Sequence, residues 1–583
     1  MATFLSKARE SRLLISSIAF LFSACCFLAG ALGHPPTPAK TTAPGYVNPA
    51  ICMTCHQNIA QAFDTTGMHR SFHRPTLADT IEDYKTHNTL YNKASGLYYT
   101  MLERDGKFYQ RRYEIGFDGK ETNVVEKQVD YVIGSGNHVR TYLHRGADGR
   151  LIEMPVSWYT EKSGYWAMSP GFDRPEYQED FRRAVPGECL YCHNGLPLQG
   201  KYPDLDVTGE SIFPKDLPDG IDCQRCHGPG GAHVRAALSK TASVETIRQA
   251  IVNPARLSRD RQLEVCMQCH LETSSRLVPN QIRRYDREIG AYKPGESLGD
   301  FTLYFDRGPS TREKDGFEIA DHAGRLRMSA CFRSSQMTCL TCHNPHEPYR
   351  SETSTARYLA TCQSCHQSVV HTVSLPTGSN CITCHMPKRR TEDVVHAVMT
   401  DHYIQPYKPK GDLLAPLSEA AVEAQGPDKV VLYYPEKLSS TSDAALYLAS
   451  AEVKHGTTMG VAHLQSAIEK YSPSAPQFYV TLGDGYTLEG KLREGIHSYN
   501  EALRRKPNFR PAAQKLAVAL MSGGQFSQAA QVLERSLATA PADDAMLSEL
   551  GRAYLREGLL PRAQRALTRE QLTYIPSDKS CTF

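Results

Sequence analysis

The chain has 583 residues, of which 40% are hydrophobic and 22% charged. This length predicts three or four domains, and the composition argues against a wholly disordered chain. A formal net charge of +3 argues against a surface specialised for binding polyanions. The 18 cysteines and 22 histidines stand out, yet the cysteines are too sparse for a small disulfide-stapled scaffold.

Residues 1–33 are typical of an export signal. Basic residues precede an apolar run from residue 13 to about 33, which ends in small residues suited to signal-peptidase cleavage. Two alternatives stay open: a lipoprotein signal ending before Cys25, or an uncleaved anchor, because the run is about 20 residues long. All three predict a mature protein outside the cytoplasmic membrane, periplasmic or extracellular, and either free or tethered.

Fourteen cysteines fall into seven Cys-x-x-Cys-His strings. They are Cys52, Cys55, His56 (string 1); Cys189, Cys192, His193 (string 2); Cys223, Cys226, His227 (string 3); Cys266, Cys269, His270 (string 4); Cys339, Cys342, His343 (string 5); Cys362, Cys365, His366 (string 6); and Cys381, Cys384, His385 (string 7). In such a string the thiols add to the vinyl groups of haem and the histidine becomes the proximal iron ligand. Zinc sites and redox dithiols do not require a histidine after every pair. The strings therefore predict seven covalently attached haem c groups.

Residues 34–410 are expected to form one seven-haem domain. Within the long gap after string 1, runs rich in tyrosine and valine alternate with Asp-Gly pairs, which predicts a small antiparallel β insertion at about 90–165. From residue 186 to about 399, short polar helices and loops lie between the strings. Such segments cannot build a conventional core, so the haems are expected to supply the apolar surface.

A linker is expected at 411–440, followed by a repeat domain at 441–576. Four prolines recur at spacings of 34, 34 and 35 residues, and four glycines recur every 34 residues: Pro473, Pro507, Pro541 and Pro576; Gly456, Gly490, Gly524 and Gly558. This pattern resembles the tetratricopeptide repeat, whose paired helices stack into an α-solenoid. We count three clear repeats and a degenerate first one. The predicted fold class is mainly α.

The haem region also resembles a known family. String 3 continues as Gly-Pro-Gly-Gly-Ala-His233 and string 5 as Asn-Pro-His346, which is similar to multihaem cytochromes of the cytochrome c-552/c-554 class. In that class a histidine just after a string ligates another haem. The resemblance implies bis-histidine irons with these distal ligands: His138, His233, His322, His346, His371, His396 and His402. Met68 or His69, after string 1, stays open as a further ligand.

These features predict an electron-transfer protein whose repeats dock redox partner proteins. One alternative is a multihaem oxidoreductase that acts on a small nitrogen or sulfur compound at one haem with an open position. Arg140, Tyr142 and His144 are the candidate neighbours of such a site, although none is assigned as catalytic. A second alternative is a subunit of an extracellular cytochrome assembly. No nucleic-acid partner is expected, membrane contact is expected only through the N-terminus, and the oligomeric state stays open.

Overall fold

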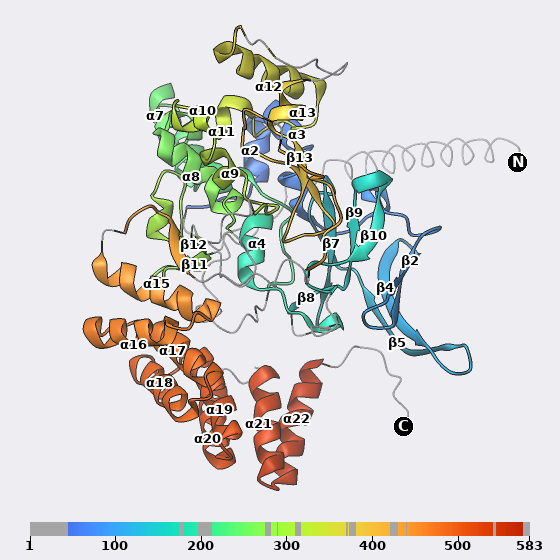
Figure 1. The fold of residues 1–583 in the computed structure, drawn as a ribbon, viewed down its shortest axis with the longest axis vertical. Coiled ribbons are helices and arrows are strands. Elements are labelled where there is room, and N and C mark those ends of the chain that lie inside the picture. Colours follow the sequence, from blue (N-terminus) through green and yellow to red (C-terminus); the bar gives the residue numbers. More distant parts are fainter. Residues whose placement is uncertain are drawn as a thin grey trace, which may run out of the picture.

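The computed structural model describes residues 45–147, 149–173, 180–195, 211, 213–273, 281–288, 290–308, 316–368, 371, 380–407, 409–419, 429–438, 440–539 and 544–574. Two short helices with string 1, a β-region, a region of short helices that carries strings 2 to 7, and an arc of long helices follow one another along the chain (Figure 1). The expected export signal lies outside the described residues. Among the helices that are described, none is long and apolar enough to cross a membrane.

The β-region consists of two antiparallel sheets. One has the order β1 (Phe72–His73), β6 (Tyr131–Ile133), β7 (Val139–Arg145), β9 (Val156–Tyr159), β10 (Tyr165–Met168), with β8 (Leu151–Glu153) beside β7. The other is a meander of β2 (Thr89–Asn92), β3 (Leu97–Arg104), β4 (Lys107–Ile115) and β5 (Glu121–Gln128). Asp105 and Gly106 join β3 to β4 with φ of 53° and 74°, as a type I′ hairpin turn requires. The antiparallel region expected at about 90–165 is present and extends beyond both limits.

The seven strings lie on or at the ends of short helices. The helices that carry strings are α2 (Ala50–Cys55), α4 (Gly187–His193), α5 (Cys223–His227), α8 (Arg259–His270), α11 (Cys339–Cys342), α12 (Glu352–Cys365) and α13 (Cys381–His385). Between them lie α3 (Gln57–Phe63), α6 (Gly231–Leu238), α7 (Val244–Gln249), α9 (His322–Arg327) and α10 (Ala330–Arg333), which contain no string. The region also contains strands that the sequence pattern did not predict. They are β11 (Gln281–Arg283), β12 (Thr302–Arg307), β13 (Lys388–Arg390) and β14 (Val398–Thr400).

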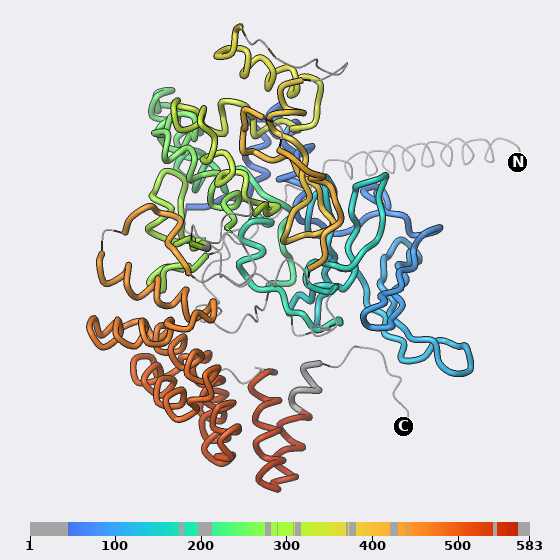
Figure 2. The backbone as a smooth tube through the Cα atoms, in the orientation of Figure 1, coloured from blue at the N-terminus to red at the C-terminus, as the bar shows by residue number. Residues whose placement is uncertain are grey.

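The C-terminal arc consists of four helical hairpins. They are α15 (Thr441–His455) with α16 (Gly460–Tyr471), α17 (Pro476–Leu488) with α18 (Leu492–Arg505), α19 (Arg510–Ser522) with α20 (Phe526–Leu537), and α21 (Asp544–Arg556) with α22 (Leu560–Tyr574). The tube in Figure 2 shows the hairpins stacked along the chain as a solenoid. The four glycines that recur every 34 residues all lie between paired helices with φ between 73° and 79°. Glycine tolerates this left-handed conformation, so the period marks the turn of each hairpin.

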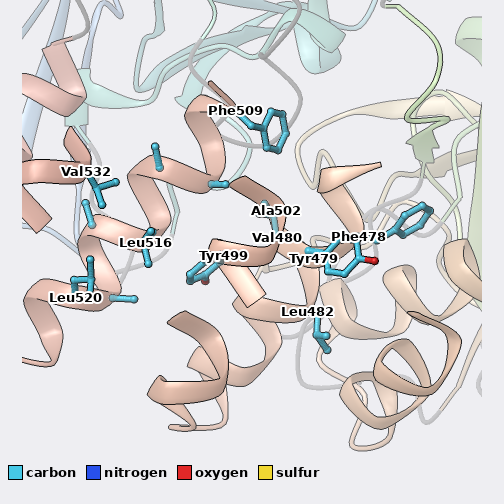
Figure 3. Packing of buried hydrophobic residues seen from close by; sticks show 14 of the residues in the cluster. Phe478, Tyr479, Val480, Leu482, Tyr499, Ala502, Phe509, Leu516, Leu520 and Val532 are labelled. Atoms are coloured by element: carbon cyan, nitrogen blue, oxygen red, sulfur yellow. The ribbon is translucent and has the colours of Figure 1, made fainter. Parts of the chain in front are cut away.

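Small residues allow the paired helices to approach closely. A Cβ on Gly483 of α17 would lie 2.5 Å from the ring of Tyr499 on α18, so only glycine fits at this crossing. Figure 3 shows Tyr499, Ala502, Leu516 and other buried side chains packed between successive helices. Burial of this continuous apolar core holds the solenoid together.

The solenoid is packed directly against the string region. Strand β15 (Val430–Tyr434), within the segment expected to be a linker, pairs with β12. Tyr447 on α15 contacts the ring of Tyr285 at 5.1 Å, and its hydroxyl accepts a 2.7 Å hydrogen bond from the Tyr285 backbone N–H. Phe478 of α17 lies against both rings, and Arg284 forms an ion pair with Asp443. One apolar cluster therefore runs from the β11–β12–β15 sheet into the solenoid.

Candidate haem-attachment sites

Helical geometry sets the two thiols of each string side by side. In α5 and α13 the cysteines stand three residues apart on a single helical turn and so share one face. Side-chain caps begin these turns: Asp222 accepts a 2.9 Å hydrogen bond from the backbone N–H of Gln224, and Asn380 accepts from Ile382 at 3.0 Å. The histidine that follows is held at the end of the same turn, as two thioether bonds and one iron ligand require.

Thiols from different strings lie in contact with one another. The contacting pairs are Cys52 with Cys223, Cys192 with Cys269, Cys266 with Cys339, and Cys362 with Cys381. Strings 5 and 6 also meet where Thr361 donates a 3.4 Å hydrogen bond to the Thr341 carbonyl. The side chain of Gln268 in string 4 donates to the Arg225 carbonyl of string 3 at 3.2 Å. String 4 therefore adjoins strings 2, 3 and 5, and the other contacts extend the series to strings 1, 6 and 7.

The burial of the strings changes along this series. On α8, which carries string 4, Leu263, Met267 and Gln268 are at most 7% exposed. Cys55 of string 1 and Cys365 of string 6 are exposed. Cys189 of string 2 is exposed as well, so the helix of string 4 is enclosed by protein while strings 1, 2 and 6 each have a cysteine open to solvent.

Five proximal histidines face an imidazole that the sequence proposed as a distal ligand. The ring centroids are 6.3 Å apart for His56 and His233, 6.0 Å for His227 and His346, 6.3 Å for His385 and His371, 6.2 Å for His343 and His402, and 5.0 Å for His270 and His322. With metal–nitrogen bonds of about 2 Å, two imidazoles on opposite sides of one iron have ring centres about 6 Å apart. Four of the pairs match this spacing, so the residues present fit bis-histidine haem.

Backbone carbonyls fix the tautomer of several of these rings. The Nδ1 atom of His227 lies 2.8 Å from the Val252 carbonyl oxygen, and that of His385 lies 2.6 Å from the Gln405 carbonyl. His233 has the same arrangement with Ile247 at 2.9 Å. A carbonyl can only accept, so Nδ1 carries the proton and Nε2 keeps its lone pair for a metal.

Burial keeps several of the histidine rings neutral, as the following pKa shifts indicate. It lowers the pKa of His402 and of His193 to about 4, and it lowers the pKa of His322 well below its usual value. Burial is also the main cause of the lowered pKa of His227 and His270. The neutral form, which predominates at neutral pH, is the form that binds iron.

The structure places His138 and His396 differently from the five facing distal candidates. His138 donates from Nδ1 to the Val398 carbonyl at 2.8 Å, and its Nε2 lies 3.0 Å from the Tyr349 hydroxyl. His396 Nε2 lies 2.8 Å from the Asp173 carboxylate. Within the described part of the chain, neither ring contacts the imidazole of a string. The described residues likewise bring no distal candidate into ring contact with the proximal histidines of strings 2 and 6.

The other sequence candidates are engaged with carboxylates. His69 Nε2 lies 3.5 Å from Asp64. The buried Tyr142 hydroxyl donates to Glu82 at 2.7 Å, and Arg140 forms an ion pair with the same carboxylate. The His144 ring lies 3.0 Å from the Asp130 carboxylate. Arg140, Tyr142 and His144 thus contact carboxylates in the β-region rather than residues of a string.

The raised pKa of Asp222, which caps string 3, predicts that the free energy of unfolding depends on pH. Burial raises its pKa to about 6, above the ordinary value of 3.8. The folded chain therefore holds this proton more tightly than the unfolded chain, and stability is lost as the pH rises from about 4 to about 6. Asp222→Asn is expected to remove this contribution, which is at most about 3 kcal/mol. Denaturant unfolding of both proteins at pH 4 and pH 7 measures it; an identical pH dependence in the variant would contradict the assignment.

Sequence reasoning missed the groups that support the imidazoles. The carbonyl acceptors are backbone atoms, for which side-chain identity gives no signal. For buried Asp401 the sequence gives only a weak indication of a supporting role, namely that it immediately precedes His402. Contacts between thiols of different strings join segments far apart in sequence and follow no spacing rule.

Comparison with known proteins supports the two main parts of this description. Residues 333–371 match the family model described as a doubled CXXCH motif, and residues 486–548 match that of the tetratricopeptide repeat. The chain is 25% identical over 188 residues to the multiheme cytochrome MtrA of Shewanella baltica (strain OS185). That match covers 30% of this chain, and the chain spans about half (51%) of the relative's length.

Solved structures match part of the chain. A MamA protein aligns at 17% identity over 23% of this chain and 73% of its own, with a TM-score of 0.22. MamA from Desulfovibrio magneticus RS-1 aligns at 19% identity over 24% of this chain and 77% of its own, also at 0.22. Likeness at this level carries no functional conclusion.

Proposed function

We propose that this chain, a multihaem c-type cytochrome with tetratricopeptide repeats, transfers electrons along a branched series of seven haems. The contacts between strings carry the proposal. Thiols join strings 1 and 3, 2 and 4, 4 and 5, and 6 and 7, and hydrogen bonds join strings 3 and 4 and strings 5 and 6. Thioether bonds form at the edge of a porphyrin, so two strings with adjoining thiols would hold their porphyrin edges close together. The resulting order is string 1, 3, 4, 5, 6, 7, with string 2 joined at strings 3 and 4, because Arg225 of string 3 lies over the Tyr191 ring of string 2.

Each bound haem would supply a one-electron couple, and the residues of the chain control it. The four histidine pairs with centroids about 6 Å apart would hold haem irons, and His270 with His322, at 5.0 Å, is proposed to do so after a small separation of the two rings. The buried surroundings of string 4 exclude water, and the carbonyl partners of the imidazoles increase ligand basicity. Strings 1, 2 and 6, each with an exposed cysteine, are suited to exchange electrons with other molecules.

The solenoid is the proposed docking surface for a redox partner. Stacked helical hairpins form an extended surface of the kind that binds other proteins, and the family match supports this class of interaction. We further propose that the protein is exported, because covalent haem attachment and the N-terminal pattern are consistent with a compartment outside the cytoplasm.

Electron paramagnetic resonance and optical spectra of the oxidised protein, with and without nitrite and cyanide, test this function. Low-spin signals from every haem and no response to either ligand would support electron transfer alone. A high-spin fraction of about one-seventh that binds ligand would overturn that conclusion in favour of an oxidoreductase.

The covalent assignment of string 7 has its own test. Cys384→Ala removes one of its two thioether bonds, so the variant is expected to lose one haem in seven or to fail in maturation. Haem content per chain and the mass of the mature protein measure the change. An unchanged value of seven haems per chain would refute the assignment.

A further inference from the structure

Two of the proposed distal imidazoles meet in the interior although they lie 80 residues apart. The ring centroids of His322 and His402 are 4.8 Å apart. His322 begins α9, and His402 follows β14. Because His322 faces His270 and His402 faces His343, the ligand sets of strings 4 and 5 come together at this point.

A buried ion pair joins the two segments that carry these rings. Arg325, one helical turn after His322, donates from Nε to one oxygen of Asp401 at 2.9 Å and from Nη2 to the other at 2.6 Å. Asp401 is 0% exposed and immediately precedes His402. A bidentate pair fixes direction as well as distance, so a shift of α9 relative to β14 would break two charge-assisted hydrogen bonds.

A second arginine completes the network. Arg389 of β13 donates to Asp401 at 3.1 Å, and the backbone N–H of Tyr403 donates to the same carboxylate at 2.8 Å. The carboxylate is therefore held from three segments. The charges of this network lie in the interior, where screening by water is weak, and Arg325 lines the same small cavity as His322 and His402.

We propose that the Arg325–Asp401–Arg389 network is a positioning and potential-setting device for the two haem sites of strings 4 and 5. It fixes His322 and His402 relative to each other, and its buried charges act on both reduction potentials, because a positive charge favours the added electron and a negative charge opposes it. The inference rests on the proposed function, since it takes both histidines as haem ligands.

The test compares substitutions of opposite charge in the full-length, haem-loaded protein. Asp401→Asn removes the negative charge and is expected to shift the potentials of two haems upward. Arg325→Gln removes a positive charge and is expected to shift the same two potentials downward. Spectroelectrochemical titration measures the potentials, and electron paramagnetic resonance shows whether both irons stay low-spin.

Arg325→Lys separates charge from geometry. It keeps the positive charge but cannot form the bidentate pair, so the potentials should stay near those of the native protein while the resonance g-values of the two haems change. If Asp401→Asn fails to mature, the potentials and g-values of Arg325→Lys and Arg325→Gln still test the proposal. Native-like g-values in Arg325→Lys would overturn the positioning role.

Glu82→Gln is the matched control, because Glu82 forms an equally buried pair with Arg140 in the β-region, with side chains 3% and 5% exposed. It should leave every potential unchanged. Shifts of the same sign in Asp401→Asn and Arg325→Gln, or an equal shift in the control, would overturn the potential-setting role. Failure of the proposed function itself would appear earlier, in the spectrum of the native protein.

Discussion

His270→Met is expected to trap electrons at the centre of the haem series. The haem of string 4 stays attached through its two thiols, but methionine in place of an axial histidine raises its potential. For a one-electron couple, a difference of about 59 mV in potential changes the equilibrium constant for electron exchange tenfold. A rise of about 120 mV would therefore slow the transfer of an electron from this haem to its neighbours about a hundredfold. Spectroelectrochemical titration measures the rise, and conductance across a protein monolayer measures the slowed transfer.

The matched control makes the same ligand change at an end of the series. His56→Met in string 1 should raise one potential by a similar amount, with a much smaller loss of conductance, because string 1 adjoins only string 3 in the described contacts. If both variants lose conductance equally, string 4 is not the junction of the series.

Tyr447→Ala is expected to separate the unfolding of the solenoid from that of the haem region. Tyr447 is 4% exposed, packs on Tyr285 and Phe478, and accepts the hydrogen bond from the Tyr285 backbone. Truncation of a buried aromatic side chain costs about 3–5 kcal/mol of stability. Here the lost contacts are those between the solenoid and the string region, which we call the solenoid junction. Thermal unfolding followed by helical circular dichroism and by haem absorbance should change from coincident transitions to two separate ones.

Leu533→Ala is the control for this experiment. Leu533 is 0% exposed within the solenoid core, on α20, and its truncation costs about 2–5 kcal/mol. It should lower the stability of the solenoid without changing the contacts of Tyr447. The proposed junction is wrong if Leu533→Ala separates the two transitions and Tyr447→Ala does not.

The parts of the fold that depend on local signals were predictable. The 34-residue period predicted repeated pairs of helices, and the structure shows that the period recurs because each hairpin turn has a glycine in the left-handed conformation. Asp105-Gly106 likewise predicted a hairpin, since its conformation is set within two residues. In contrast, pairing of β15 with β12 joins segments more than 120 residues apart and depends on tertiary packing.

The candidate haem-attachment sites likewise combine features that the sequence predicts with features that it does not. Attachment positions follow from a five-residue pattern, whereas the partner of each imidazole depends on how distant segments fold together. His233 lies only six residues after His227 of string 3 and yet faces His56 of string 1. Nothing in the spacing around His396 shows that Asp173 would lie 2.8 Å away. Electrostatic partners of this kind become visible only in three dimensions.

The sheet that ties the solenoid to the string region has a kinetic consequence. A protein held on the solenoid would be tethered to the haem series through a rigid junction rather than a flexible chain. Its collisions with an exposed haem edge would then be intramolecular, at an effective concentration that can reach millimolar when the geometry allows both contacts. Even a weakly bound partner could exchange many electrons before it dissociates, so the junction would convert modest affinity into high turnover.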